Sequence, residues 1–288
     1  MIRLRLSHLI PTLRIHSWGG FGSQIFTAQL ILRLQENYPN RRIKVVVHTS
    51  GVTRRQSELN FEALGVKMLQ IEDFQDLRYF GFNNTVTSLY GDITQKLRSF
   101  FSLTLIRLCI IQNANSEESF NQIKFWTLAL RGHYTGLILK KPTIQLLFRK
   151  LFDGEDASSI DRNRFVVHYR LGDLLNLGNK KPIDSARLEI ILKNLSPSEN
   201  LPLLLSDSDP EEVRRYLENS PVLMNSPIAN YDPLTTLATC IYAETFVGTG
   251  AKISLWAAIF RSTLFGRESY LPIELRWVNN NSTYISWY

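Results

Sequence analysis

The chain has 288 residues, of which 44% are hydrophobic and 20% are charged, and it contains 15 glycines, 11 prolines and two cysteines. This composition excludes a collagen-like, low-complexity or disulfide-stapled chain, and the length fits one large or two medium globular domains. The formal net charge of +7 leaves nucleic acid, an anionic membrane surface and an anionic substrate open as partners.

The positive charge is concentrated in the first half of the chain. Residues 1–150 carry 20 Lys and Arg against 9 Asp and Glu, a net charge of +11, whereas residues 151–288 carry 13 against 17, a net charge of −4. The basic residues of the first half are dispersed, without an aromatic-interleaved patch or a DNA-reading motif. We therefore expect no nucleic-acid partner, whereas an anionic membrane surface stays open.

Cysteine and histidine usage points away from a disulfide framework and from a metal site. Cys109 and Cys240 each lie in an apolar stretch, which predicts reduced core residues in a reducing compartment. No Cys/His cluster has the spacing of metal ligands, so we expect no bound metal. Residues 1–15 lack the long apolar core of a signal peptide, and the most apolar window, 100–111, is too short to span a bilayer. These features predict a cytoplasmic protein.

Strand and helix patterns alternate along the first half. The apolar spacing from Gln24 to Gln35 is helical, and Pro39 lies just past its end. Residues 93–150 are expected to be mainly helical. The other predicted elements of this half are strands at 13–16, 43–47 and 67–71 and a helix at 54–64. Such alternation is typical of a parallel sheet covered by helices.

The polar segment 153–163 predicts a linker, and a second alternation follows it. Asp209 is expected to cap a helix that has Pro210 at its first position. Strands are predicted at 165–169, 201–205 and 245–248, and helices at 184–195, 232–243 and 251–261. We therefore predict an α/β fold of two Rossmann-like domains facing a cleft, with an N-terminal domain at 1–152 and a C-terminal domain at 164–288.

The strand pattern at 165–169 leads into polar residues, in the run FVVHYRLGD at 165–173. His168, Arg170 and Asp173 are thereby placed at the carboxyl end of a buried strand, the edge of an open α/β sheet where ligands bind. A guanidinium held there suits a phosphate, because its planar fork matches two phosphate oxygens. The alternative is a surface ion pair between Arg170 and Asp173.

Two strand-to-helix turns are candidate anion cradles. Residues 19–22 read GGFG and residues 249–254 read TGAKIS, and glycine-rich turns at a helix start offer backbone N–H groups to an anion. Neither turn is a dinucleotide fingerprint or a Walker loop. The alternatives are a tight turn at the first and a Thr N-cap with a solvent-facing Lys252 at the second. A third polar turn, Ser206-Asp207, either positions a ligand or only turns the chain.

The order of these motifs resembles the fucosyltransferase superfamily, above all the bacterial alpha-1,2-fucosyltransferases that build surface polysaccharides. The family's Gly-Gly-x-Gly-Asn-Gln-x-Phe turn corresponds to GGFGSQIF at 19–26, and its His-x-Arg-Arg-Gly-Asp motif to HYRLGD at 168–173. Its Phe-Ser-Asp-Asp phrase corresponds to LSDSD at 205–209, and its last motif, ending in Trp-Ala-Ala, to FVGTGAKISLWAA at 246–258. The resemblance spans most of the chain.

The resemblance implies a GT-B-like fold, a GDP-fucose donor held largely by the C-terminal domain, inversion at the anomeric carbon and no metal or other cofactor. Arg170 matches the arginine that binds the donor's β-phosphate. The further donor-binding candidates are Gly20, Gly22 and Ser23 on the N-terminal side and His168, Asp207, Asp232, Thr249, Lys252 and Ser254 in the second domain.

Several positions depart from the family pattern. Leu171 stands where many relatives have a second Arg, and Lys252 is the candidate for compensating charge. Thr236 falls where relatives often place an Asp that reads the guanine edge, and Asp232, one helical turn earlier, is the candidate substitute. An inverting transfer also needs a base for the acceptor hydroxyl. Asp173 is one candidate for this base, and an orienting partner of Arg170 is its alternative role.

The sequence therefore predicts an inverting, metal-independent glycosyltransferase that moves fucose from GDP-fucose to a sugar hydroxyl of a glycan or lipid-linked oligosaccharide. Two alternatives stay open: a glycosyltransferase with another nucleotide sugar, and a non-catalytic protein that binds a nucleotide or glycan. The basic first half suits peripheral docking at the inner face of an anionic membrane.

Overall fold

The computed structural model describes residues 11–49, 58–71, 108–153, 165–175, 181–195, 201–276 and 283–288. The chain divides into two compact units, Met1–Ile138 and Leu139–Tyr288. Each unit contains one sheet, and every strand pairing within the described residues is parallel. Helices connect successive parallel strands, as such sheets require. The predicted α/β fold of two Rossmann-like units is thereby confirmed.

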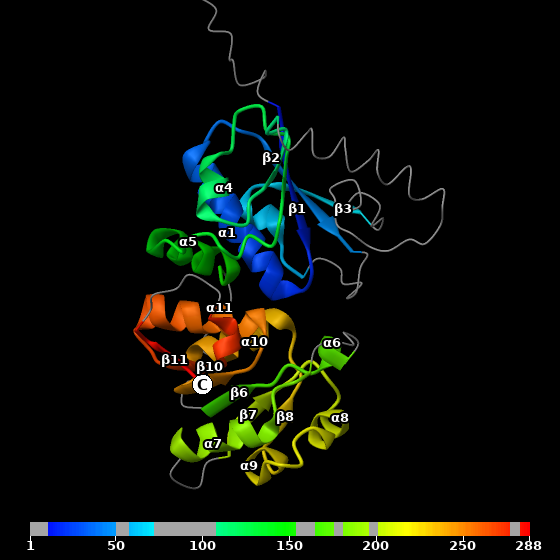
Figure 1. The fold of residues 1–288 in the computed structure, drawn as a ribbon, viewed down its shortest axis with the longest axis vertical. Coiled ribbons are helices and arrows are strands. Elements are labelled where there is room, and N and C mark those ends of the chain that lie inside the picture. Colours follow the sequence, from blue (N-terminus) through cyan, green and yellow to red (C-terminus); the bar gives the residue numbers. More distant parts are fainter. Residues whose placement is uncertain are drawn as a thin grey trace, which may run out of the picture. The chain divides into compact units, whose positions relative to one another are not determined.

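The sheet of the first unit has the strand order β3-β2-β1-β5-β4. The helix α1, Phe21–Asn37, follows β1, and thirteen of its residues, from Phe21 to Leu34, are buried. Figure 1 shows α1 beside the strands of this sheet. The strands are β1 (Leu13–Trp18), β2 (Ile43–His48), β3 (Lys67–Ile71), β4 (Ile111–Asn113) and β5 (Ala129–Arg131), and the short helices are η2 (Phe61–Leu64) and α4 (Glu117–Asn121).

Two of these strands correct the expectation that residues 93–150 are mainly helical. Within 108–153 the chain forms β4 and β5 before it reaches a long helix. Each strand has only three residues, so neither repeats often enough to show an alternating pattern in the sequence. Of the helix expected at 54–64, residues 54–57 lie outside the described residues, residues 58–60 are not helical, and the last four residues form the short 3₁₀ helix η2.

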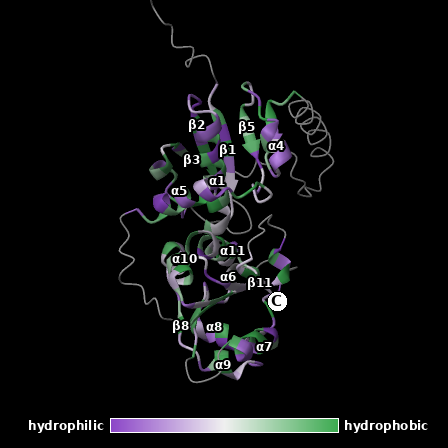
Figure 2. Cartoon of the chain, turned by 90° about the vertical axis from the view of Figure 1, so that its left-hand side faces the viewer, coloured by the Kyte–Doolittle hydropathy of each residue, from purple (hydrophilic) through white to green (hydrophobic). Residues whose placement is uncertain are grey.

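The sheet of the second unit has the order β11-β10-β9-β6-β7-β8. Its central strands β9, β6 and β7 are mainly apolar, and all their residues except Thr245 and Phe165 are buried, as expected of a parallel sheet covered on both faces. Figure 2 shows hydrophobic and hydrophilic residues mixed along α7 (Ser185–Leu195). The buried Leu188 and Leu192 of this helix share a hydrophobic cluster with Val167 and Leu204 of the sheet. The strands are β6 (Phe165–His168), β7 (Leu203–Leu205), β8 (Ile228–Ala229), β9 (Thr245–Gly248), β10 (Ser269–Leu271) and β11 (Ile285–Trp287).

The helices of this unit largely follow the sequence expectations. Asp209 caps α8 through a bond from the Glu211 N–H, and Pro210 is the first helical residue, which confirms that prediction. The helices are α6 (Gly172–Leu175), α7 (Ser185–Leu195), α8 (Pro210–Arg215), α9 (Pro221–Met224), α10 (Pro233–Tyr242) and α11 (Lys252–Phe260), followed by η4 (Arg261–Phe265) and η5 (Ile273–Leu275).

The division between the units lies before the helix α5, Lys141–Leu151, whereas the sequence placed the boundary after it. The ring of Phe148 in α5 lies 5.5 Å from that of Phe260 and 6.0 Å from that of Phe265. These aromatic contacts attach α5 to the second unit. The amphipathic pattern of α5 predicts a buried face, but the pattern carries no information about which sheet that face covers.

Arg261 fixes α10 against the end of α11. Its side chain is fully buried and donates to the carbonyl groups of Cys240, Ile241 and Ala243. These carbonyls lie at the C-terminus of α10, where a cation also interacts favourably with the helix dipole. Burial, and then the neighbouring Arg267, lower the pKa of Arg261 to about 10.

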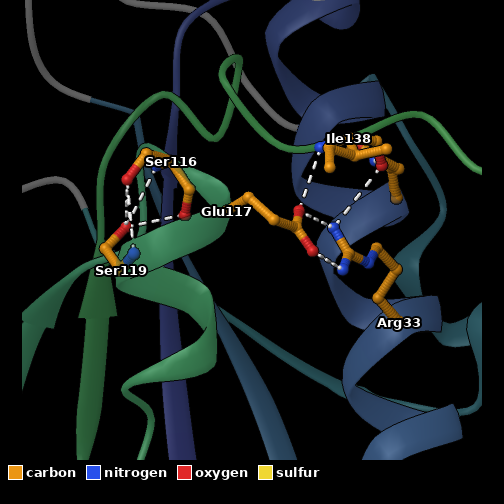
Figure 3. Close-up of polar contacts among 6 residues, drawn as sticks. Arg33, Ser116, Glu117, Ser119 and Ile138 are labelled. Carbon is orange, nitrogen blue, oxygen red and sulfur yellow. Dashed lines mark hydrogen bonds and ion pairs between the residues drawn. The ribbon is translucent and has the colours of Figure 1, made fainter.

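An ion pair between a buried arginine and a partly exposed glutamate holds α1 to α4 in the first unit (Figure 3). The guanidinium of Arg33 donates to both carboxylate oxygens of Glu117, at 2.6 and 2.5 Å, and lies 4.2 Å from the ring centre of Phe120. Glu117 also accepts from the Ile138 N–H at 3.1 Å. Ser116 begins α4 with a capping box, which fixes the helix end that carries Glu117. One carboxylate therefore joins three segments of the unit.

Replacing Glu117 with Gln is expected to destabilise the first unit by about 3 kcal/mol, because Arg33 keeps a buried charge without its counter-ion. Urea unfolding followed by circular dichroism measures this loss. Glu118→Gln, at the exposed next position, is the control and is expected to change the free energy of unfolding little. Equal losses in the two variants contradict the importance of this ion pair.

Candidate functional site

The second sheet reverses its strand order at β6. The chain runs outward from β6 to β7 and β8 and then returns to place β9 on the other side of β6. In open α/β sheets, ligands bind outside the carboxyl ends of the two strands that flank such a switch point. His168 ends β6 and Gly248 ends β9, and these residues are paired in the register of the two strands. The segments that follow them carry Arg170 and the turn 249–254.

The main chain after β6 is held by side chains from both neighbouring strands. The Arg170 N–H donates to the Thr249 hydroxyl at 3.0 Å, and the N–H groups of Leu171 and Gly172 donate to one carboxylate oxygen of Asp207 at 3.0 and 2.9 Å. The Thr249 N–H in turn donates to the His168 carbonyl at 3.1 Å. The structure therefore brings Arg170, Asp207 and Thr249 together at one edge, as the sequence predicted for their strand ends.

Gly172 leaves room for this arrangement. A Cβ atom at this position meets a carboxylate oxygen of Asp207 at 2.9 Å and the Asp207 carbonyl oxygen at 3.0 Å. These contacts are closer than side-chain carbons ordinarily make, so a larger residue displaces Asp207 from the two N–H groups it accepts. Close packing against Asp207 therefore explains why a glycine occupies this position of the HYRLGD motif in this chain.

Asp207 remains ionised in this setting. Burial alone raises the pKa of its carboxyl group, but the hydrogen bonds from Leu171 and Gly172 and the nearby His168 outweigh burial, so that the pKa lies below its usual value. A carboxylate that accepts backbone N–H groups is stabilised in its charged form. The sequence predicted that Asp207 contacts the donor. In the structure, one of its carboxylate oxygens accepts the N–H groups of Leu171 and Gly172, in the loop that carries Arg170.

The turn after β9 lies across the switch point from Arg170. The helix α11 begins at Lys252, and its N-cap residue, Ala251, provides no side-chain hydrogen bond to the first N–H groups. Gly250 is exposed and has open space where a Cβ atom projects. An N-terminus of this kind favours an anion through its N–H groups and dipole. Thr249 is not the N-cap, which corrects the alternative considered for it.

Two predicted contacts are used inside the protein. Ser254 is fully buried, and its hydroxyl is hydrogen-bonded to Nδ1 of His168 at 2.7 Å. Thr249 is 1% exposed, and its hydroxyl accepts the Arg170 N–H. In this structure both hydroxyl groups position the loops around the switch point. His168 is likewise buried beneath the loop that carries Arg170.

Asp232 and Thr236 lie at the start of α10. The Asp232 carboxylate accepts from the N–H groups of Leu234 and Thr235, both at 3.0 Å, and so caps the helix. Burial raises the pKa of the Asp232 carboxyl group, but these hydrogen bonds lower it by more. The pKa therefore lies below its usual value. The Thr236 hydroxyl donates to the Tyr231 carbonyl. Asp232, the candidate for reading a guanine edge, and Thr236, at the position where relatives often place an Asp, therefore both have local structural roles.

Asp173, the candidate base, lies in α6 directly after Gly172. Its side chain lies outside the part of the chain that the structure describes. Its predicted role therefore stays a prediction.

The N-terminal candidates surround the beginning of α1. Gly19 adopts a positive φ of 86° and Gly20 is the N-cap residue, whereas Gly22 and Ser23 already belong to the helix. The Phe21 N–H donates to the Glu58 carboxylate at 2.6 Å. Sequence reasoning missed Glu58, because no motif marks it. Its negative charge competes with an anion for this helix start, so the predicted diphosphate contact here stays a prediction.

Gln24 connects the same turn to the segment around Glu58. Its side-chain nitrogen donates to the Gly19 carbonyl, and its side-chain oxygen accepts the N–H groups of Glu58 and Leu59. Gln24 belongs to the GGFGSQIF motif. Its role in this chain is to fix the glycine turn and the Glu58 carboxylate relative to each other.

Sequence reasoning also missed a histidine pair at the carboxyl end of the first sheet. Nδ1 of His16 lies 2.8 Å from Nε2 of His48, and both rings are buried. Burial, and then His48, lower the pKa of His16 to about 3, so that its ring is neutral near pH 7. The Tyr134 hydroxyl donates to the His16 carbonyl at 2.6 Å, which places the GHY segment at 132–134 beside β1.

No family of known proteins and no curated protein matches the chain. Solved structures similar to it include the E. coli heptosyltransferase WaaC with ADP, at 10% identity over 96% of this chain and 92% of that one, with a TM-score of 0.47. The E. coli ADP-heptose lps heptosyltransferase II matches at 13% identity over 96% and 90%, with a TM-score of 0.44. The glycosyl transferase family 9 protein from Veillonella parvula matches at 10% over 91% and 80%, with a TM-score of 0.43. The likeness is weak and concerns the fold alone.

The described residues contain neither a metal-binding cluster nor a membrane-spanning helix. They contain no group of three or more His, Cys, Asp or Glu side chains that is placed to hold a metal ion. Among the same residues, no helix has both the length and the apolar composition that crossing a bilayer requires.

His168 makes the stability of the second unit depend on pH. Burial, opposed by Asp207 and assisted by Arg170, lowers the pKa of His168 from 6.5 to about 4. Between these two values the unfolded chain binds a proton that the folded chain does not bind. The stability contributed by the neutral ring is therefore present above pH 6.5 and is lost as the pH falls towards 4.

The wild-type chain is expected to lose about 2 kcal/mol more unfolding free energy between pH 7 and pH 5 than His168→Asn loses. Asn retains a hydrogen-bonding group for Ser254 but does not titrate in this range. Urea unfolding at the two pH values measures the difference, and contributions from His16 cancel because both chains contain it. An identical loss in both chains contradicts the assignment of the low pKa to His168.

Proposed function

We propose that this chain is a glycosyltransferase that binds a nucleoside diphosphate sugar at the carboxyl edge of its second sheet. The observation that carries the proposal is the position of Arg170 at the switch point, on a main chain held by Thr249 and Asp207. Across that point begins α11, whose N-cap residue, Ala251, provides no side-chain hydrogen bond. A guanidinium and a helix N-terminus together suit the two phosphates of such a donor.

The chemistry of the proposed reaction explains why Arg170 needs a fixed position. Departure of the nucleoside diphosphate builds negative charge on the β-phosphate as the bond to the sugar breaks. Donors that are oriented before the reaction stabilise this charge without a cost of reorganisation. Arg170 supplies a charged donor, and Lys252, the first residue of α11, is the second cation proposed to act there. In this mechanism the transfer is inverting and uses no metal.

GDP-fucose is the proposed donor, and a sugar hydroxyl of a glycan or lipid-linked oligosaccharide is the proposed acceptor. The support is the HYRLGD motif at 168–173 together with the three other motifs that resemble those of the alpha-1,2-fucosyltransferases. An acceptor of this kind belongs to the synthesis of cell-surface polysaccharides. The acceptor hydroxyl loses its proton as it attacks, and Asp173 is the proposed base.

One observation favours a different nucleotide sugar as the second candidate. Asp232 uses one carboxylate oxygen to cap α10, and the Thr236 hydroxyl is bonded to a backbone carbonyl. Reading guanine through its N1–H and exocyclic amine takes two acceptor positions, and one of the two Asp232 carboxylate oxygens already accepts the N–H groups of Leu234 and Thr235. A donor with another base leaves the proposed role of Arg170 unchanged.

A donor panel separates these candidates. Purified protein is incubated with GDP-fucose, GDP-mannose, ADP-heptose and UDP-sugars, and release of the nucleotide is measured. Release from GDP-fucose alone supports the fucosyl assignment, and release from another donor overturns that assignment but retains the reaction. Binding of a donor without release in the presence of a glycan acceptor mixture supports a non-catalytic nucleotide-binding protein instead.

Arg170→Lys is expected to lower the turnover of the active donor roughly 100-fold to 1000-fold, because the ammonium cannot make two parallel contacts to a phosphate. Nucleotide release under saturating donor measures kcat. Arg215→Lys, an exposed arginine at the end of α8, is the matched control and is expected to have wild-type turnover. Near-normal turnover in Arg170→Lys refutes the role of Arg170.

A further inference from the structure

The amino edge of the first sheet exposes large apolar side chains that the proposed chemistry does not use. Phe125 is 66% exposed and Trp126 is 43% exposed, in the segment that precedes β5. Leu108, 57% exposed, precedes β4, and Leu128 is 42% exposed directly before β5. We call these four residues, together with the cations described below, the amino-edge surface.

The four apolar residues lie together. The rings of Phe125 and Trp126 are 4.7 Å apart, and the Trp126 indole N–H donates to the Leu108 carbonyl at 3.0 Å. Leu128 pairs with the start of β1, because its carbonyl accepts the Arg14 N–H at 2.8 Å. Exposed large apolar side chains that gather at one edge of a sheet mark an interaction site more often than a scattered single leucine does.

The exposure of these side chains results from a rigidly held segment. Arg41 is buried and donates to the carbonyls of Lys124 and Thr127. The Thr127 hydroxyl donates to the Cys109 carbonyl at 2.8 Å, and the Tyr38 hydroxyl donates to the Ile123 carbonyl at 3.2 Å. The segment 123–128 is therefore anchored by buried polar groups, while Phe125 and Trp126 remain in contact with solvent.

Basic residues lie at the same amino edge of the sheet as the apolar residues. Arg14, Lys44 and Lys67 are register partners across the neighbouring strands β1, β2 and β3. Partners on adjacent strands stand about 4.8 Å apart and on the same face of the sheet, so these three cations form one row. Figure 1 shows the three strands side by side. Arg42, whose carbonyl accepts the Leu13 N–H, and Lys124 add two exposed cations at the same edge.

We propose that the amino-edge surface docks on an anionic lipid bilayer. Leucine and phenylalanine side chains enter the boundary between headgroups and acyl chains, tryptophan resides at that boundary, and Lys and Arg attract acidic headgroups. The charge of the surface is complementary to such a membrane. A nucleic acid shares this charge complementarity, but it offers no apolar environment for Leu108 and Leu128. The docking proposal does not depend on the identity of the donor or on catalysis.

Vesicle co-sedimentation of the full chain tests the proposal. Vesicles of phosphatidylcholine alone are compared with vesicles that also contain phosphatidylglycerol. We expect binding to the anionic vesicles only, and we expect added salt to weaken it, because the Debye length shortens. Equal binding to both vesicle types, or no binding to either, overturns the proposal.

Two variants locate the docking surface. Arg14→Glu combined with Lys44→Glu is expected to lower the partition coefficient by roughly fivefold or more for each residue. Phe125→Ser combined with Trp126→Ser is expected to lower the partition coefficient to a similar extent, because the variant lacks the two aromatic side chains that insert into the bilayer. These side chains are at least partly exposed, and thermal unfolding shows whether each variant retains the wild-type fold.

The matched control is Arg215→Glu combined with Arg276→Glu, two exposed cations of the second unit. This control removes the same charge from the chain and is expected to bind anionic vesicles as the wild type does. An equal loss in the control overturns the proposed location. Single-stranded RNA that displaces the chain from vesicles, with an affinity that falls in the Phe125→Ser, Trp126→Ser variant, assigns the surface to nucleic acid and also overturns the proposal.

Discussion

The arrangement of the second unit depends on how the chain is held as it leaves β6. Three consecutive N–H groups, from Arg170 to Gly172, find their acceptors in two side chains, Thr249 from the end of β9 and Asp207 from the end of β7. The two side chains come from the segments that follow the strands on either side of β6. One short loop thus bonds to both neighbours of the central strand, and the sheet edge becomes a single rigid frame.

This frame separates the polar residues near the sheet edge into two groups. One group holds the loops in place, and the other is proposed to bind the ligand. The side chains of Asp207 and Thr249 accept main-chain N–H groups, and the buried side chains of His168 and Ser254 are hydrogen-bonded to each other. Arg170 and the start of α11 are the groups that we propose bind the ligand. Charge stabilisation by fixed groups is the largest contribution in many enzymes, and it requires such a supporting layer.

The sequence could predict the strands and helices that carry strong patterns, and with them the strand ends that meet at the switch point. The sequence could not predict β4 and β5, because three-residue strands show no periodicity, nor the unit to which α5 belongs, because amphipathicity does not identify a partner. The sequence also could not predict which hydroxyl and carboxylate groups contact a ligand and which only position the loops. Thr249 and Ser254 fit a phosphate cradle by motif, and only their burial and bonding partners show that they position loops.

The most direct measurement is calorimetric binding of nucleoside diphosphates and monophosphates to the wild-type chain and to Arg170→Ala. The pairs GDP and GMP, ADP and AMP, and UDP and UMP are compared, so that the outcome does not depend on which base is read. If Arg170 binds the β-phosphate, the wild type prefers the diphosphate of at least one pair, and the variant loses that preference but keeps its affinity for the monophosphate. A variant that retains the full preference for the diphosphate contradicts this role for Arg170.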